Sequence, residues 1–342
     1  MKIELYFSEV LAEALAVLDD AIAPINFFAT NSIKQVKSFS LLFTMPLYIT
    51  ALASGSNGNC YYVGTNKEAI LIDVGVCCKE VENRMKLLRL PLHQLKAIFI
   101  SHEHTDHIKG VRVLSKKYNI PVYITTTTLR SCRLKLEKHL IRKFSWQQPT
   151  AIGDLQVKAF GKQHDAAEPC SFVVSFKDLN VGVFTDIGTP CSQLIHYFKQ
   201  CHAAFLESNY DENMLESGSY PYYLKSRIRG GKGHLSNTQA LEIFRSYRSP
   251  QLSYLLLSHL SKNNNCPQLV NRLFQSYAGP TKIVVTSREE ATPIYVIEEK
   301  NVLIKPARPK IHLLQQLSFH FDEHIAQSLT HQNSALSDAL PV

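Results

Sequence analysis

The chain of 342 residues contains no uninterrupted apolar run of membrane-spanning length, so we expect no transmembrane helix and no membrane partner. It also has no CxxC pair and no regular cysteine spacing. Its eight cysteines are scattered, apart from the adjacent Cys77 and Cys78. This pattern favours buried or idle thiols in a reducing cytoplasm. A metal role for the adjacent pair, which lies close to Asp73, stays open.

The N-terminal segment lacks the features of a secretory signal. A signal peptide needs a basic start and a small-residue cleavage site, whereas here Glu4 and Glu9 interrupt the segment and Asp19 and Asp20 follow it. The chain also shows no internal repeat and no low-complexity tract. We therefore expect a cytoplasmic protein.

Acidic residues are fewer than basic ones, and the formal net charge is +8. Hydrophobic residues make up 45% and charged residues 19% of the chain, as in an ordinary globular protein. The basic residues gather in two places, at 130–143 and directly before His234. The second cluster comprises Lys225, Arg227, Arg229 and Lys232. Such clusters commonly contact phosphates, and a solvated basic face is the alternative.

The most informative segment is Ser-His-Glu-His-Thr-Asp-His at 101–107, which follows the apolar stretch 97–100. The apolar stretch predicts a buried strand that ends in a polar loop. Imidazole and carboxylate groups bind zinc and related metals. His102 and His104 would project the same way from an extended loop, whereas the Asp-His pair that follows begins the next predicted helix. One loop would thus serve two neighbouring metals; a histidine-rich surface turn is the simpler alternative.

Three more candidate ligands follow apolar, strand-like stretches later in the chain. His164 follows 155–160, Asp186 follows 181–185, and His259 follows 254–258. Each would lie at the C-terminal end of a strand, where α/β folds gather their functional groups. A single residue of this kind is usually structural, but three in series predict a common site.

Strand-like and helix-like stretches alternate along the chain. The predicted strands are 47–53, 60–63, 69–73, 97–100, 122–125, 155–160, 181–185, 252–258, 283–285 and 294–297. The predicted helices include 108–117 and 237–247. This order predicts an α/β fold in which two sheets lie between layers of helices, with metals at one edge.

With these residues in place, the chain resembles the metallo-β-lactamase fold superfamily over roughly residues 46 to 300. That family has an Asp after an early strand, then HxHxDH, then His, Asp and His at later strand ends. The resemblance implies an αββα sandwich with a dinuclear site for two divalent ions, zinc or manganese before others. It assigns His102, His104 and His164 to the first ion, Asp106, His107 and His259 to the second, and Asp186 to both. It further implies that Asp73 orients the HxHxDH loop.

Segments 53–59, 233–237 and 257–265 resemble the YycJ (WalJ) group of bacterial metallohydrolases, whose activity class is 5′-to-3′ trimming of DNA. Similarity to tRNase Z implies two further roles, in which Glu207 supports the site and His234 donates a proton to the leaving group. Asn263 departs from the Glu that is common in the group.

The first of these segments is also a candidate phosphate-binding turn. Ser54, Ser56 and Asn57 could hold a phosphate through backbone amides. Tight-turn chemistry alone explains Gly55 and Gly58 almost as well. From the basic cluster before His234, we expect Arg229 and Lys232 to contact substrate.

The interval between Asp186 and His259 separates this chain from several relatives. It spans 73 positions, too short for the second domain that RNase J-type enzymes insert there. No long exosite arm of the tRNase Z kind is apparent. A bridging Asp186 also argues against lactam hydrolysis.

We therefore predict a metal-dependent phosphodiesterase, favouring a DNA nuclease of the 5′-to-3′ exonuclease type with nucleic acid as its partner. A metal-bridging hydroxide would attack phosphorus, with Asp106 and His234 as the catalytic residues. Hydrolysis of a small or cyclic phosphodiester is the alternative. A non-catalytic metal-binding scaffold is a weaker one.

The chain divides into three predicted parts. Residues 1–44 form an N-terminal extension or a misassigned start, with Met45 as the alternative first residue. Residues 45–300 form the hydrolase domain, and 301–342 form a C-terminal tail.

Overall fold

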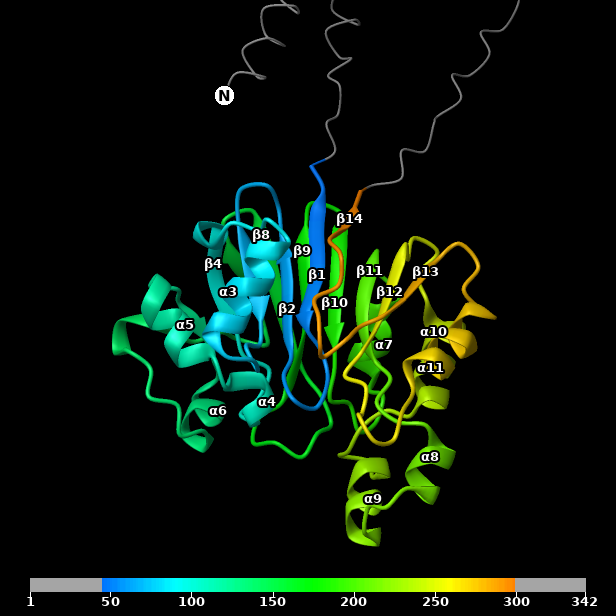
Figure 1. The fold of residues 1–342 in the computed structure, drawn as a ribbon. Helices are drawn as coiled ribbons and strands as arrows, with labels where there is room; N and C mark the ends of the chain where they lie inside the picture. Colours follow the sequence, from blue (N-terminus) through cyan, green and yellow to red (C-terminus); the bar gives the residue numbers. More distant parts are fainter. Residues whose placement is uncertain (1–44, 299–342) are drawn as a thin grey trace, which may run out of the picture. The chain divides into compact units, whose positions relative to one another are not determined.

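In a computed structural model, which describes residues 45–298, the chain forms two seven-stranded sheets between layers of helices (Figure 1). This confirms the predicted αββα class. The parts predicted at 1–44 and 301–342 lie outside the described residues, so the domain boundaries stay predictions. No helix within 45–298 combines the length and the apolar character that a membrane crossing requires.

The two sheets have mirror-like strand orders, β14-β1-β2-β3-β4-β5-β6 and β13-β12-β11-β10-β9-β8-β7. The first contains β1 Leu47–Ala53, β2 Cys60–Gly64, β3 Ala69–Ile72, β4 Leu95–Phe99, β5 Val122–Tyr123, β6 Ile141–Arg142 and β14 Tyr295–Ile297. The second contains β7 Thr150–Ile152, β8 Leu155–Gly161, β9 Cys170–Phe176, β10 Leu179–Phe184, β11 Ala203–Glu207, β12 Tyr254–Ser258 and β13 Lys282–Val285.

Parallel pairing decides where the site forms. Strands β3 to β6 are parallel to one another, and so are β10 to β13. The carboxyl ends of parallel strands meet at one edge of a sheet, so the residues that follow them gather there. Helices α4, α8 and α9 lie at this same end of the molecule (Figure 1).

Helices cover both outer faces of the sandwich (Figure 1). On the first sheet lie α3 Cys78–Leu87 and α5 Val111–Tyr118; on the second lie α7 Ser192–Phe198, α10 Asn237–Tyr247 and α11 Pro267–Gln275. The remaining helices are α4 Thr105–Ile108, α6 Thr126–Ser131, α8 Glu212–Ser217 and α9 Tyr222–Arg229, with 3₁₀ turns at Leu92–Gln94 and Lys138–Leu140.

Most strands read as continuous apolar runs because both of their faces are buried. In β12, Leu256 packs between the two sheets, whereas its neighbours Leu255 and Leu257 pack under the helices. Three apolar layers result, and they hold the strand ends in fixed positions.

One predicted helix is confirmed in full and another in part. Helix α10 runs from Asn237 to Tyr247 as predicted, with a capping box between Ser236 and Gln239. The helix predicted at 108–117 is instead two helices, α4 and α5, which are separated near Gly110. A Cβ at Gly110 would lie 2.1 Å from the Val76 carbonyl oxygen, so the break occurs where the chain packs directly on the loop after β3.

Candidate metal centre

Three predicted site residues lie in tight turns at strand ends. Asp73, Asp186 and His259 follow β3, β10 and β12, with φ values of 59°, 55° and 59°. A left-handed backbone at a non-glycine residue costs about 1–3 kcal/mol and persists only where the surroundings enforce it. The turns aim these side chains across the edge of the sandwich.

Asp73 anchors the HxHxDH loop. Its Oδ1 accepts a hydrogen bond from the Ser101 amide at 2.8 Å, and its Oδ2 accepts one from the Ser101 hydroxyl at 2.7 Å. The same Oδ2 lies 2.7 Å from His107 Nδ1. One buried carboxylate thus fixes both the start of the loop and a histidine near its end, which is where the predicted orienting role requires it.

The first predicted ligand set converges on a small triangle of nitrogens. His102 Nε2 and His104 Nδ1 are 3.0 Å apart, and His164 Nε2 lies 3.3 Å from the same His104 nitrogen. Two nitrogens bound tetrahedrally to zinc at 2.0–2.1 Å lie about 3.3 Å apart. The three histidines therefore fit one metal ion.

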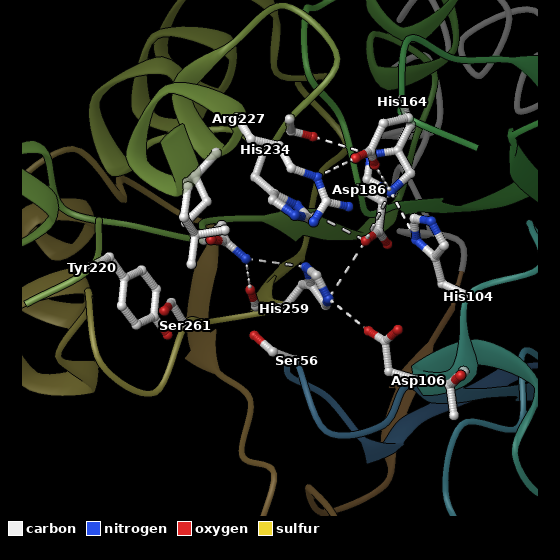
Figure 2. A pocket seen from close by; sticks show the side chains of 16 residues that line it. Ser56, His104, Asp106, His164, Asp186, Tyr220, Arg227, His234, His259 and Ser261 are labelled. Carbon is white, nitrogen blue, oxygen red and sulfur yellow. Dashed lines mark hydrogen bonds and ion pairs between the residues drawn. The ribbon is translucent and has the colours of Figure 1, made fainter. Parts of the chain in front are cut away.

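The second set converges beside the first. Asp106 Oδ2 lies 3.4 Å from both His107 Nε2 and His259 Nε2. Between the two sets, Asp186 places Oδ2 3.3 Å from His107 Nε2, and Oδ1 3.5 Å from His259 Nε2 and 3.8 Å from His164 Nε2. Figure 2 shows His259 reaching both Asp106 and Asp186. Asp186 touches ligands of both sets, as its predicted bridging position requires.

The outer nitrogens of these histidines have partners that fix their tautomers. His164 Nδ1 lies 3.1 Å from the Gly233 carbonyl oxygen, and His259 Nδ1 lies 3.0 Å from Glu207 Oε1. An Nδ1–H bonded in this way leaves Nε2 as the nitrogen that is directed at the centre.

Glu207 connects the metal centre to His234. It is fully buried at the end of β11, and its carboxylate accepts hydrogen bonds from the Ile187 and Leu235 amides at 2.6 and 3.2 Å. Its Oε1 also lies 2.7 Å from His234 Nδ1. Burial alone would raise the pKa of Glu207, but the charge of His234 and the hydrogen bonds outweigh it and lower that pKa to about 2. The carboxylate is therefore ionised.

Two histidines of the first set, His102 and His164, are buried and neutral. Burial lowers the pKa of His164 to about 4 and holds that of His102 well below its usual range. In His259, burial also acts to lower the pKa, but the carboxylates of Asp186 and Glu207 outweigh it and raise the pKa to about 10.

The donor atoms at this centre fit a divalent metal site. Asp186 is ionised, since the charges of His259 and His107 outweigh its burial and hold its pKa well below the usual range. Within residues 45–298, its buried Oδ2 has no hydrogen-bond partner, as expected of an oxygen that awaits a cation. Overlapping groups of three or four donor atoms lie within 4.8 Å of one another around it. Imidazole and carboxylate donors suit zinc and manganese alike.

A cavity of about 420 Å³ opens over this centre (Figure 2). The metal-side residues that line it include His104, Asp106, His164, Asp186, His234 and His259. Tyr220 also lines it, as do Leu224, Arg227 and Ile228 of α9. His102 and His107 are fully buried behind the metal side.

The three residues of the predicted phosphate-binding turn lie in different surroundings. Ser56 lines the cavity. Ser54 is buried, and its hydroxyl accepts a hydrogen bond from the His259 amide at 2.8 Å, so it supports the turn at His259 from behind. Asn57 is exposed and outside the cavity lining. Only Ser56 lies where a bound phosphate could meet it directly.

The basic residues before His234 are also dispersed. Arg229 and Lys232 do not line the cavity, and Arg229 forms an ion pair with Glu216 at 2.9 Å. Arg227 does line it, with its Nε donating to Asp165 Oδ2 at 2.5 Å. Substrate contact by Arg229 and Lys232 therefore stays a prediction.

Three buried polar residues of the centre were missed by the sequence reasoning. Asn59 Nδ2 lies 3.2 Å from His107 Nε2, and Asn209 Nδ2 donates to the His259 carbonyl oxygen at 2.7 Å. Lys162 Nζ donates to the Thr185 carbonyl oxygen at 2.6 Å. Asn59 stands within the segment 53–59, whereas Lys162 and Asn209 lie two residues from His164 and Glu207. Asparagine and lysine are too common in loops to be selected from the sequence.

Sequence comparison relates this chain to proteins of known family. The family model described as beta-lactamase superfamily domain matches residues 69–259, which span the site from Asp73 to His259. Exodeoxyribonuclease YycJ of Bacillus anthracis is 35% identical over 233 residues, covering 66% of this chain and 86% of that protein. Exodeoxyribonuclease WalJ of Streptococcus pneumoniae is 32% identical over 256 residues, covering 71% and 95%.

Solved structures show the same fold at low sequence identity. YhfI of Bacillus subtilis, a metallo-beta-lactamase fold protein, aligns with a TM-score of 0.58 at 14% identity, covering 74% of this chain and 99% of that one. Zn²⁺-bound PqqB of Methylobacterium extorquens aligns with a TM-score of 0.57 at 12% identity, covering 72% and 99%. The matched family, the sequence relatives and the geometry together place this chain in the beta-lactamase superfamily.

Proposed function

We propose that this protein is a metal-dependent exodeoxyribonuclease that cuts DNA from its 5′ end. The observation that carries the proposal is the convergence of two ligand sets on Asp186, with the Glu207–His234 pair beside them in one cavity. The exodeoxyribonuclease names of the two sequence relatives support the choice of DNA and of exonucleolytic cutting.

Seven side chains would hold two divalent ions: His102, His104, His164, Asp106, His107, His259 and Asp186. When bound, the ions would lower the pKa of a water molecule that serves as the nucleophile and would neutralise charge on the phosphoryl oxygens. Asp73 and Glu207 would keep the histidine rings in their binding orientation through the outer nitrogens.

His234 would supply the proton that the leaving oxygen needs. Its Nδ1 is occupied by Glu207, so Nε2 is the nitrogen available to substrate. The Glu207 carboxylate orients the His234 ring through this contact, as a carboxylate does for a catalytic histidine in hydrolases. His234 also lines the cavity, where proton transfer to a leaving alkoxide is possible in geometric terms.

Cytoplasmic action is part of the proposal. All eight cysteines are free, and Cys60, Cys170 and Cys201 are buried in apolar surroundings. Burial raises the pKa of the Cys201 thiol to about 12, so this thiol is unreactive. A chain that leaves every thiol unpaired fits a reducing compartment.

The decisive experiment compares substrates on the metal-loaded protein. DNA labelled at the 5′ or 3′ end, the matching RNA and bis(p-nitrophenyl) phosphate are incubated separately, and the products are resolved. We expect mononucleotides or short fragments released from the 5′ end of DNA, with slower cutting of RNA. Rapid hydrolysis of a small cyclic phosphodiester with no attack on DNA would refute the nuclease assignment and leave a small-molecule phosphodiesterase.

A further inference from the structure

Helix α9 presents different faces to the cavity and to the surroundings. Leu224, Arg227 and Ile228 line the cavity together with the candidate metal ligands. Tyr223 lies four residues before Arg227 and is therefore its neighbour on the helix surface. The surface of α9 next to the cavity thus begins with an aromatic ring.

Two consecutive tyrosines begin this helix, and both are largely exposed. Tyr222 is 75% and Tyr223 is 74% exposed. The other large hydrophobic side chains that are exposed within 45–298 stand singly: Leu87, Val113, Trp146, Tyr277 and Val296. Neither ring contributes to the packing of the domain core. Their apolar faces remain available to a ligand that approaches the cavity.

The charge on α9 indicates what kind of ligand this is. The helix carries Lys225, Arg227 and Arg229 and no acidic residue. The Arg229 guanidinium lies 5.6 Å from the centre of the Tyr222 ring. The Arg227 side chain is 61% exposed even with its ion pair to Asp165. Basic groups between aromatic rings suit a chain that offers both phosphates and flat bases.

Resting on the proposed nuclease function, we infer that α9 is a stacking platform for unpaired bases of the strand whose phosphodiester lies at the metal centre. Tyr223, beside Arg227, would stack a base just outside the cavity. Tyr222, beside Arg229, would stack a base further along the strand. Stacking accepts any base, since every base has a π-face. This surface would therefore bind a strand end without sequence preference.

A protein partner fits this surface less well. The helix carries three cations and no acidic residue, so its charge favours a polyanionic strand. In a duplex the bases are stacked on one another, so a duplex end would have to fray before it could use the platform. The inference therefore predicts that single strands engage the enzyme more tightly than blunt duplexes of equal length.

The test uses metal-loaded full-length protein and a series of tyrosine substitutions. The variants are Tyr222→Ala, Tyr223→Ala, the double Ala variant and the corresponding Phe variants. Tyr277→Ala is the matched control, because Tyr277 is exposed but outside the cavity lining. KM and kcat are measured with a short single-stranded oligothymidine and with bis(p-nitrophenyl) phosphate. Thermal unfolding checks that each variant is folded.

We expect each Ala substitution to raise KM for the single strand at least about fivefold, since stacking one base contributes roughly 1–3 kcal/mol. The Phe variants and Tyr277→Ala should match the unsubstituted protein, and the small phosphodiester should be cut at an unchanged rate. Unchanged KM in the double Ala variant overturns the platform, as does an equal defect in the Phe variants. Failure of the unsubstituted protein to cut any DNA would instead reject the proposed nuclease function itself.

Discussion

The metal ligands of the cavity and its α9 residues differ in burial and in the number of contacts that hold them. On the metal side, His102, His107 and Asp186 are 0–1% exposed, and each is held by several partners. On the other side, α9 contains no buried residue, and its first two rings project outward. The two walls differ in how firmly their positions are determined.

This difference corresponds to a difference in task. Metal ligands must be held within a fraction of an ångström, and the orienting hydrogen bonds of Asp73 and Glu207 provide that precision. A wall that accepts any nucleotide gains nothing from such precision and needs adaptable contacts. We therefore expect substitutions on the metal side to affect chemistry, and those on α9 to affect substrate affinity.

Replacing the shared ligand should have the largest effect. Asp186→Asn removes the charge that neighbours both ligand sets, so metal content should fall and hydrolysis of every substrate should be lost. Metal analysis and initial rates measure both. Asp178→Asn is a control, since Asp178 lies in the turn between β9 and β10, away from the cavity lining. A fully active Asp186→Asn protein would contradict the claim that substitutions among the metal ligands abolish the chemistry.

Replacing His234, the proposed proton donor, should have the next largest effect. His234→Ala should keep its metals and lose about 10²–10⁴-fold in kcat on DNA. The loss should be smaller on bis(p-nitrophenyl) phosphate, whose leaving group needs no proton. Equal losses on both substrates would indicate that His234 positions the substrate instead.

Two glycines test how tightly each wall is packed. A Cβ at Gly75 would lie 1.6 Å from the Asp106 carbonyl oxygen, whereas a Cβ at Gly231, just after α9, meets nothing closer than Thr189 Oγ1 at 3.3 Å. Gly75→Ala should cost about 1–3 kcal/mol of stability and weaken metal binding, because the chain at Asp106 must shift. Gly231→Ala should be nearly neutral. Thermal unfolding measures the stability of the two variants, and metal titration measures their metal affinity. Equal losses in the Gly75→Ala and Gly231→Ala proteins would contradict the tighter packing at Gly75.

Neutralising one cation of the substrate wall should have the smallest effect. Arg227→Gln should weaken DNA binding a few-fold and reduce the slope of log K against log salt by about one, as one fewer counterion is released. Turnover of bis(p-nitrophenyl) phosphate should not change. A salt titration of oligonucleotide binding measures the slope. An unaltered slope would show that Arg227 does not contact a DNA phosphate.

The sequence predicted the metal side better than the substrate side, for a physical reason. The HxHxDH spacing and the strand-end positions of Asp186 and His259 follow from local chemistry and β periodicity, and the predicted ligands do meet in space. The residues that hydrogen-bond the outer histidine nitrogens could be predicted only where they belong to a known motif, as Asp73 does. Asn59 and Asn209 act through buried amides, which long-range packing brings to the histidines.

The substrate wall depends on exposure, which residue type alone does not reveal. In the basic cluster before His234, Arg227 lines the cavity, and substrate contact by Arg229 and Lys232 stays a prediction. Neighbours on a helix point about 100° apart, so proximity in sequence to His234 does not place a side chain on the same side. The break at Gly110 was missed for a similar reason, because it arises from contact with the Val76 backbone.

The central claim is that two ions, held by the seven converging side chains, enable hydrolysis of DNA. The most direct test is a metal titration of chelator-treated protein, with cutting of 5′-labelled DNA followed at each step. We predict little activity up to one equivalent of manganese or zinc and a rise to full activity at two. Full activity without metal, or with a single equivalent, would contradict the account.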